Sequence, residues 1–242
     1  MKIDSGTRVV VTGASRGIGA AVADAFEARG CEVGRVSRSG AISANVGDPE
    51  SIERALEDFG PIDVLVANAG VAHYLPFAEM PLETVDELTR VNWLGTAYSV
   101  KAALPGMLQR GRGHIVIVSS GAGIRSFPGA AVYGATKAAQ RGFGEALRHE
   151  LSGTGVSLTV VYPGEIATSL HDHEKERMPS WYRIERSVDP GPLAQAVVKA
   201  VEDEAREVFY PRSVRLLRIV HGLRPAFADA MLRRLMGPSA AP

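Results

Sequence analysis

The sequence has few of the features that mark specialised classes of protein. It contains a single cysteine, Cys31, so no disulfide can form within the chain, and a reducing compartment is expected. Lys plus Arg and Asp plus Glu both number 27, and this balance gives no overall sign of a nucleic-acid partner. No long uncharged apolar stretch is present, and none precedes the strand-like run that begins at Arg8, which argues against a transmembrane span and a secretory signal. Together these absences predict a cytoplasmic protein.

What is present is the composition of an ordinary folded domain, 45% hydrophobic and 22% charged. Short apolar runs alternate with longer helical patterns. The expected strands are Arg8–Thr12, Glu32–Val36, Ala41–Val46, Ile62–Asn68, His114–Ser119, Val156–Tyr162 and Glu207–Tyr210. The expected helices are Gly17–Arg29, Pro49–Phe59, Thr84–Gln109, Ala131–Leu151 and Pro190–Glu204. Runs such as Val9-Val10-Val11 are typical of strands buried on both faces.

This alternation predicts an α/β fold, a Rossmann-type doubly wound parallel sheet. No linker and no internal repeat divides residues 1–242, so a single domain is expected. Between Arg38 and Val46 there is room for a turn and a short strand but not for a crossover helix, since a parallel pair normally needs a dozen or more connecting residues. The connection after the second strand is therefore predicted to be a loop.

A glycine-rich turn follows the first strand and opens the first helix, with the sequence Thr12-Gly13-Ala14-Ser15-Arg16-Gly17-Ile18-Gly19. Gly13 permits a tight turn, Gly17 lets the backbone approach a pyrophosphate, and Gly19 permits close packing of helix on sheet. The helix N-terminus then offers free N–H groups to phosphate oxygens. The turn predicts a dinucleotide site, although three glycines in an ordinary strand-to-helix turn are the simpler alternative.

The residues after the second strand indicate which dinucleotide is bound. A site selective for NAD places Asp or Glu there, whereas this strand ends Val36-Ser37-Arg38-Ser39. Arg38, with Arg16 from the glycine turn, could bind a 2′-phosphate. The alternative is that both arginines are solvated surface residues. The pattern favours NADP(H).

Tyr133 and Lys137 lie four apart on a helical pattern and so share one face. Transfer of a hydride to a carbonyl needs a proton for the oxygen, and an ammonium near a tyrosine lowers the pKa of the phenol. Ser120 follows a strand and could hold the substrate oxygen. A surface tyrosine and a solvated lysine would give the same spacing by chance, but the glycine turn and the serine together favour a catalytic set.

With these residues the chain resembles the classical short-chain dehydrogenase/reductase (SDR) family over roughly Thr7 to Tyr210. Three further segments match the family's motifs. They are Asn68-Ala69-Gly70, Asn92 in Val91-Asn92-Trp93, and Pro163-Gly164-Glu165-Ile166-Ala167-Thr168. The sequence departs from the family pattern at Ala67, at Asn45 and in the missing crossover helix, which leaves the adenosine end of the site more open.

The resemblance implies roles for individual residues. Tyr133 is similar to the catalytic acid/base, Lys137 to the residue that lowers its pKa and holds the nicotinamide ribose, and Ser120 to the substrate-orienting hydroxyl. Asn92 is similar to the anchor of a water relay, the alternative being a buried asparagine whose amide is satisfied. The implied cofactor-binding residues are Gly13, Ser15, Arg16, Gly17, Ile18, Gly19, Ser37, Arg38, Asn45, Val46, Asn68, Ala69, Gly70, Tyr133, Lys137, Pro163, Gly164, Ile166 and Thr168.

Residues 165–188 are predicted to form a substrate lid, because they are too polar for a core. His171 and His173 lie in this segment, but no third ligand has suitable spacing, so no metal is expected. The pocket mouth is expected to include Phe127, Pro128, His73 and Tyr74. This mixture, mostly apolar, favours a hydrophobic ketone or alcohol as substrate.

The segment Arg212–Met236 is expected to form two short helices around Arg224-Pro225. It carries six arginines against the single acid Asp229, together with many large apolar residues. Such basic amphipathic helices can lie on anionic membranes. The favoured alternative is that they pack over the substrate pocket or against a neighbouring subunit.

The sequence thus predicts an NADP(H)-dependent oxidoreductase that interconverts a secondary alcohol and a ketone or aldehyde. A catalytically silent dinucleotide-binding sensor or scaffold is the second hypothesis, and an epimerase or dehydratase of the related extended family is a third. A homodimer is expected through the helices around Trp93–Gln109 and Ala131–Leu151, with a tetramer as the alternative.

Overall fold

The computed structural model describes residues 1–168, 170 and 188–236, and contains one seven-stranded sheet with the order β3-β2-β1-β4-β5-β6-β7. All neighbouring strands are parallel. The strands are β1 (Arg8–Thr12), β2 (Glu32–Ser37), β3 (Ile42–Ser43), β4 (Val64–Ala67), β5 (Gly113–Val118), β6 (Val156–Pro163) and β7 (Glu207–Tyr210). This confirms the predicted doubly wound, single-domain fold.

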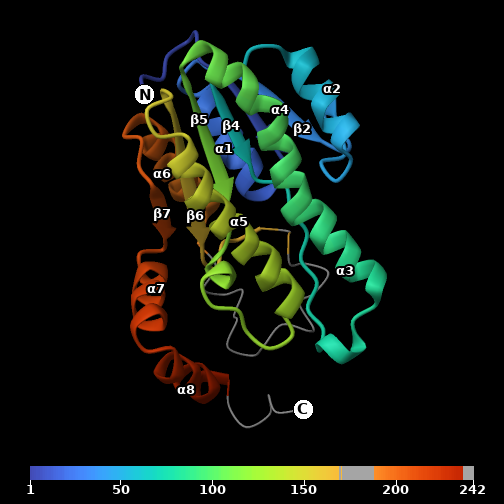
Figure 1. Ribbon diagram of the computed structural model, residues 1–242, viewed down its shortest axis with the longest axis vertical. Coiled ribbons are helices and arrows are strands. Elements are labelled where there is room, and N and C mark those ends of the chain that lie inside the picture. Colours follow the sequence, from blue (N-terminus) through green and yellow to red (C-terminus); the bar gives the residue numbers. More distant parts are fainter. Residues whose placement is uncertain (169, 171–187, 237–242) are drawn as a thin grey trace.

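Helices cover both faces of the sheet. They are α1 (Gly17–Glu27), α2 (Pro49–Phe59), α3 (Leu82–Leu88), α4 (Gly95–Arg110), α5 (Ala131–Glu150), α6 (Pro190–Glu202), α7 (Ser213–Leu223) and α8 (Pro225–Met236). Figure 1 shows α4 and α5 in front of the sheet. On the opposite face α1 and α6 pack against each other.

The continuous apolar runs are explained by burial on both faces. Val9 and Val11 belong to the hydrophobic cluster that includes Phe26 of α1 and Leu193 of α6. Val10, between them, belongs to the other cluster, with the side chains of α2, α4 and α5. Because successive strand side chains point to opposite faces, a strand covered by helices on both sides needs apolar residues at every position.

The connection from β2 to β3 is a loop, as predicted. β2 ends at Ser37 and β3 begins at Ile42, which pairs with Val36. The Ser43 hydroxyl donates a hydrogen bond of 3.1 Å to the Arg38 carbonyl and so helps to close the turn. Arg38, which lies in this loop at the edge of the sheet, is exposed to solvent.

The predicted helix Thr84–Gln109 is interrupted in the structure. A π-helical segment, Thr89–Leu94, separates α3 from α4 and contains the buried Asn92. Such segments add a residue to the turn and often occur at functional sites. The interruption could not be predicted from periodicity, because the apolar pattern continues through it.

The last two helices extend the fold at the end where the sheet's strands finish, below β7 in Figure 1. α7 and α8 meet at Arg224, as predicted. Among the described residues, no helix has both the length and the apolar character that a membrane crossing requires.

Candidate active site

A pocket of about 900 Å³ lies at the carboxyl ends of the parallel strands. This is where ligands bind in open α/β sheets. Nearly all of the sequence-predicted residues line it: Gly13, Ser15, Arg16, Gly17, Ile18, Ser37, Arg38, Asn45, Val46, Asn68, Ala69, Gly70, Ser120, Tyr133, Lys137, Pro163, Gly164, Ile166 and Thr168. Gly19 and Asn92 do not line it; both are buried behind its wall.

The glycine turn is held by tight packing against the end of β4. Gly13 has a φ of 68°, which favours glycine, and a Cβ there would lie 2.8 Å from the Ala69 Cα. A Cβ on Gly19 would lie 2.3 Å from the Gly13 carbonyl oxygen. The Asn68 side-chain amide donates to the carbonyls of Thr12, at 2.9 Å, and Gly13. Asn68 therefore fixes the turn as well as lining the pocket.

The N-terminus of α1 is open to a ligand. Its N-cap residue, Arg16, makes no side-chain capping hydrogen bond, and its first turn contains no acidic residue. In α2, by contrast, the Asp48 carboxylate accepts hydrogen bonds from Glu50 N and Ser51 N. The free N–H groups and positive dipole end of α1 therefore face the pocket and suit a phosphate or pyrophosphate.

Positive charge lies beside this turn. Arg16 and Arg38 are exposed, line the pocket and form no ion pair with any described residue. The Ser37 hydroxyl, at the end of β2, is buried without a hydrogen-bond partner in the described part of the chain. These three groups lie at one end of the pocket. A phosphorylated ribose could bind both guanidinium groups and give the hydroxyl a hydrogen-bond partner.

Tyr133 and Lys137 lie on the buried face of α5, as their spacing predicted. Burial raises the pKa of Tyr133 to about 12, and a hydrogen bond with Ser120 opposes this rise. The Lys137 ammonium lies 5.9 Å from the centroid of the Tyr133 ring. The sequence pattern predicted that the ammonium would lower the pKa of the phenol; in the structure the loss of water around the phenol raises it, and the opposing effect comes from Ser120.

Lys137 is fixed from two sides at the end of β5. Its ammonium donates a hydrogen bond of 3.1 Å to the Val118 carbonyl, and its own carbonyl accepts one of 2.7 Å from the Ser119 hydroxyl. Burial lowers the pKa of Lys137 to about 8. The lysine is therefore charged at neutral pH, but only by a small margin.

Asn92 connects separate segments of the chain through its hydrogen bonds. Its side-chain amide accepts from Val71 N at 2.8 Å, and donates to the Val71 carbonyl and the Thr136 hydroxyl. It thus links the segment after β4 to α5. Its main-chain carbonyl accepts hydrogen bonds from Thr96 and Gln140 side chains. The amide is thus satisfied by the protein itself, and the role of Asn92 in a water relay stays a prediction.

The other end of the pocket is apolar and aromatic. The Tyr74 ring lies 5.8 Å from the Tyr133 ring and 5.5 Å from the Phe127 ring, measured between centroids. Tyr74 and Phe127 line the pocket as predicted, whereas Pro128 and His73 are not among its lining residues.

Several lining residues were not predicted. Val214 and Leu217 of α7 form part of the wall, which agrees with the favoured interpretation that the C-terminal segment packs over the pocket. Arg125 also lines the pocket, and its guanidinium pairs with Asp229 of α8 at 2.6 Å. The apolar face predicted for the segment Arg212–Met236 was the sign in the sequence that α7 could cover the pocket. That pattern did not indicate which of its residues would line the wall, or which residue Arg125 would contact.

The predicted lid lies mostly outside the described residues, including His171 and His173. Its two ends are described and adjacent, since Ile166 and Val188 form a parallel bridge and Ala167 N donates to the Val188 carbonyl at 2.9 Å. In the described part of the chain, no group of three His, Cys, Asp or Glu side chains could hold a metal ion.

Comparison with known proteins identifies the family. The family model described as short chain dehydrogenase matches residues 7–179. The 3-oxoacyl-(acyl-carrier-protein) reductase of Vibrio cholerae is 33% identical, over 83% of this chain and 91% of that protein. The glycine betaine reductase of Emericella nidulans is 34% identical over 97% of this chain, but the chain spans only 19% of that protein's length.

A solved structure extends the likeness to three dimensions. The short chain dehydrogenase from Burkholderia cenocepacia J2315, in complex with NADP, has a TM-score of 0.84 and 26% sequence identity. The match covers 96% of this chain and 99% of that one. Fold, pocket position and sequence therefore agree, and the chain belongs to the short-chain dehydrogenase family of oxidoreductases.

Proposed function

We propose that this protein is an NADP(H)-dependent oxidoreductase that interconverts a hydrophobic secondary alcohol and the corresponding ketone or aldehyde. The observation that carries the proposal is the single continuous pocket. The open N-terminus of α1, with Arg16, Arg38 and Ser37, lies at one end, and Ser120, Tyr133 and Lys137 lie at the other. The NADP complex of the Burkholderia cenocepacia relative supports the choice of cofactor.

The residues present fit a nicotinamide dinucleotide. The free N–H groups of α1 and the backbone of Gly13 and Gly17 would hold the pyrophosphate. Ser37, Arg38 and Arg16 would bind the 2′-phosphate, Asn45 and Val46 would flank the adenine, and Lys137 would hold the nicotinamide ribose. Pro163, Gly164, Ile166 and Thr168 would contact the nicotinamide. The cofactor supplies or accepts the hydride.

Residues of the chain donate and accept the proton that accompanies hydride transfer. In the reductive direction Tyr133, kept protonated by its raised pKa, donates its phenolic proton to the substrate oxygen. The Ser120 hydroxyl orients that oxygen and donates to it as negative charge develops. The Lys137 ammonium then stabilises the phenolate that remains. In the oxidative direction the phenolate accepts the proton from the alcohol.

The apolar end of the pocket determines the substrate class. Tyr74, Phe127, Leu170, Val214 and Leu217 offer apolar surface there. Glu165 is the only carboxylate among the described lining residues. This surface favours a hydrophobic carbonyl compound over a small charged acid.

The cofactor choice is tested by the ratio of kcat/KM for NADPH and NADH. Each charge-assisted hydrogen bond to the 2′-phosphate contributes on the order of 1.5–3 kcal/mol, with the lower part of that range expected for exposed arginines. We therefore expect a preference for NADPH of roughly ten- to a thousandfold. The double variant Ser37→Asp/Arg38→Leu should reverse this preference, since a carboxylate binds the 2′-hydroxyl and repels the phosphate.

A matched control is Arg35→Leu, because Arg35 lies on β2 with Ser37 but pairs with Asp24 and Glu27 and does not line the pocket. It should keep the wild-type preference. Equal use of both cofactors by the wild type at low salt would show that Arg38 takes no part in selection. Binding of NADPH without turnover of any ketone or secondary alcohol would favour a dinucleotide-binding sensor.

A further inference from the structure

Helix α7 carries two apolar stripes on different faces. Val214 and Leu217 line the pocket. Leu216, Ile219 and Leu223, with the spacing i, i+3, i+7, are exposed to 61%, 49% and 77%. A helix on the surface of a globular protein normally has polar residues on its outer face. The described part of the chain therefore leaves about half or more of each of these three side chains uncovered.

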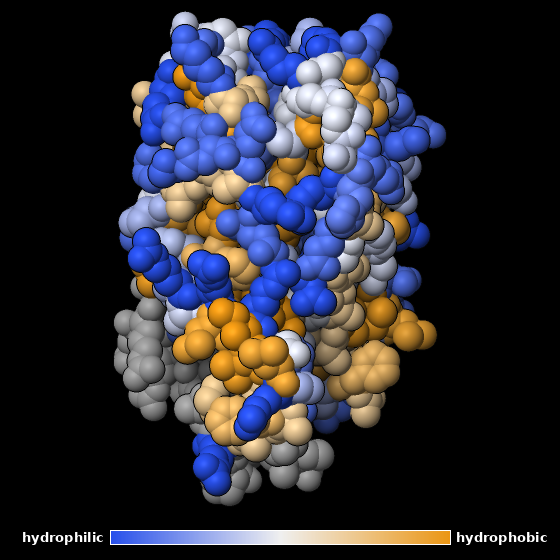
Figure 2. Space-filling view, turned by 60° about the vertical axis from the view of Figure 1, so that its left-hand side comes forward, coloured by the Kyte–Doolittle hydropathy of each residue, from blue (hydrophilic) through white to orange (hydrophobic). Residues whose placement is uncertain are grey.

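Large apolar side chains are also exposed on α8 and elsewhere at this end of the molecule. Phe227 and Met231 are exposed to 58% and 42%. Phe77 and Leu82, exposed to 66% and 76%, belong to the turn Phe77–Glu79 and the start of α3, which lie toward the same end of the molecule as α8 (Figure 1). Figure 2 shows hydrophobic residues gathered over this end. Seven of the eight large exposed hydrophobic residues in the described part of the chain are therefore at the pocket end.

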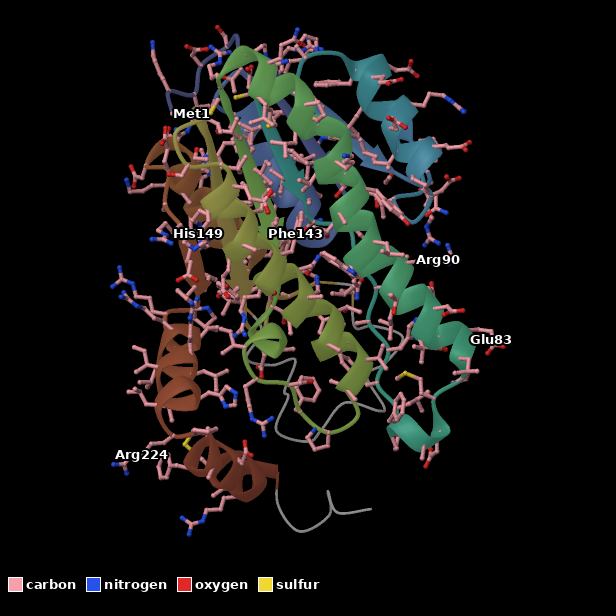
Figure 3. The ribbon with its side chains drawn as sticks, in the orientation of Figure 1. Met1, Glu83, Arg90, Phe143, His149 and Arg224 are labelled. Carbon is pink, nitrogen blue, oxygen red and sulfur yellow. The ribbon has the colours of Figure 1, made fainter. Side chains whose placement is uncertain are left out.

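Positive charge surrounds the stripe. Arg212, Arg215, Arg224 and Arg234 are exposed and form no ion pair with described residues. Figure 3 shows Arg224 at the junction of α7 and α8, pointing away from the body. Asp229 is the only acid between Arg212 and Met236, and Arg125 neutralises it. The exposed apolar stripe and its unpaired arginines, defined here as the C-terminal face, are thus apolar and basic together.

This combination selects one kind of partner. A two-fold contact between two copies would place the same patch on both sides and bring arginines against arginines, which is unfavourable. Nucleic acid would bind the charge but leave five large apolar side chains in water. An anionic bilayer offers phosphate groups for the guanidinium groups and acyl chains for the apolar residues.

We propose that the C-terminal face binds the surface of an anionic lipid bilayer. Leu216, Ile219, Leu223, Phe227 and Met231 enter the boundary between headgroups and acyl chains, and the arginines contact lipid phosphates. Because α7 also forms part of the pocket wall through Val214 and Leu217, binding brings the apolar end of the pocket next to the lipid.

Flotation of the full chain with vesicles tests this proposal. The wild type should float with phosphatidylcholine vesicles that contain about 30% phosphatidylglycerol, and less at high salt or with pure phosphatidylcholine. Leu223→Glu/Phe227→Glu should lower the partition coefficient at least about tenfold. Arg212→Gln/Arg215→Gln should lower it about fivefold for each arginine.

The matched control is Leu108→Glu. Leu108, at the end of α4, is exposed to 42% but lies outside the C-terminal face. Its variant should float like the wild type, and NADPH binding and circular dichroism should show that all variants are folded. Failure of the wild type to float at low salt would overturn the proposal, as would equal flotation of Leu223→Glu/Phe227→Glu. A dimer that this double variant dissociates, without vesicle binding, would make the face a subunit interface instead.

Discussion

At the scale of single residues, one buried side chain, that of His114, is expected to make the stability of the fold depend on pH. His114 in β5 is fully buried, and its ring nitrogens contact the hydroxyls of Thr159 and Ser157 at 2.8 and 2.9 Å. Burial lowers the pKa of His114 from 6.5 to about 4. The unfolded chain therefore takes up a proton below pH 6.5 that the folded chain does not take up until about pH 4.

The expected consequence is a loss of stability in acid. Between pH 7 and pH 4.5, His114 should lower the free energy of unfolding by about 2–3 kcal/mol, since one pKa unit corresponds to about 1.4 kcal/mol. Urea unfolding of His114→Gln at the two pH values should show a loss smaller by this amount. His149→Gln, which removes an exposed histidine of α5, is the control and should show the wild-type loss. An identical pH dependence for His114→Gln would contradict the assignment.

Residue patterns indicated which residues would line the pocket, because the proposed chemistry depends on residue type and short spacing. Gly13, Tyr133, Lys137 and Ser120 were found in this way, and all line one pocket. The sign of the pKa shift at Tyr133 could not be found, because it depends on how much water the fold excludes around the phenol. The ion pair between Arg125 and Asp229 was not predicted, because the two residues are about a hundred positions apart and only the fold brings them together.

At the scale of elements, strand and helix order was predictable from the alternation of apolar runs and amphipathic patterns. The π-helical segment before α4 was not, because Asn92 and its hydrogen bonds to Val71 and Thr136 require contacts between distant segments. The bounds of β3 and β4 were predicted too long for a related reason. Their outer residues look strand-like, but the paired ladders are limited to Ile42–Ser43 and Val64–Ala67. Beyond them only isolated hydrogen bonds continue, such as those from Ala44 N to the Ser37 carbonyl and from Asp63 N to the Arg8 carbonyl.

The junction between β1 and α1 depends on the absence of a side chain at Gly19. In Gly19→Ala the new methyl group would lie 2.3 Å from the Gly13 carbonyl oxygen and 2.4 Å from the Asn68 amide nitrogen, so the turn must open. We expect a loss of about 1–3 kcal/mol in the free energy of unfolding. The affinity for NADPH, measured by fluorescence titration, should fall about tenfold or more.

Gly142→Ala is the control for this prediction. Gly142 lies in α5, and a Cβ there would meet no described atom within 4 Å, so alanine should stabilise the helix slightly and leave NADPH affinity unchanged. Wild-type affinity in Gly19→Ala would show that the turn does not position the cofactor.

At the scale of the whole molecule, α4 and α5 both lie in front of the sheet (Figure 1). Trp93, just before α4, and Phe143 of α5 are half-buried and form an edge-to-face contact of 5.3 Å between ring centroids. We propose that this pair of helices forms a two-fold dimer contact. Gly142→Glu places a charge at an open position on this surface and should convert the dimer to a monomer in sedimentation at micromolar concentration.

Gly222→Glu, at an equally open position on α7, is the matched control and should remain dimeric. A wild type that sediments as a monomer would rule out the contact. A Gly142→Glu protein that remains dimeric would place the interface elsewhere.

The proposed function requires that one pocket joins a dinucleotide site to a proton-donating tyrosine. Its most direct test is Tyr133→Phe, assayed for NADPH-dependent reduction on a panel of hydrophobic ketones beside the wild type. Removing only the phenolic oxygen should lower kcat by about 10²- to 10⁴-fold. The dissociation constant for NADPH should stay within about threefold of the wild type, since no phosphate contact is lost. Near-normal turnover by Tyr133→Phe on a substrate that the wild type reduces well would contradict the mechanism.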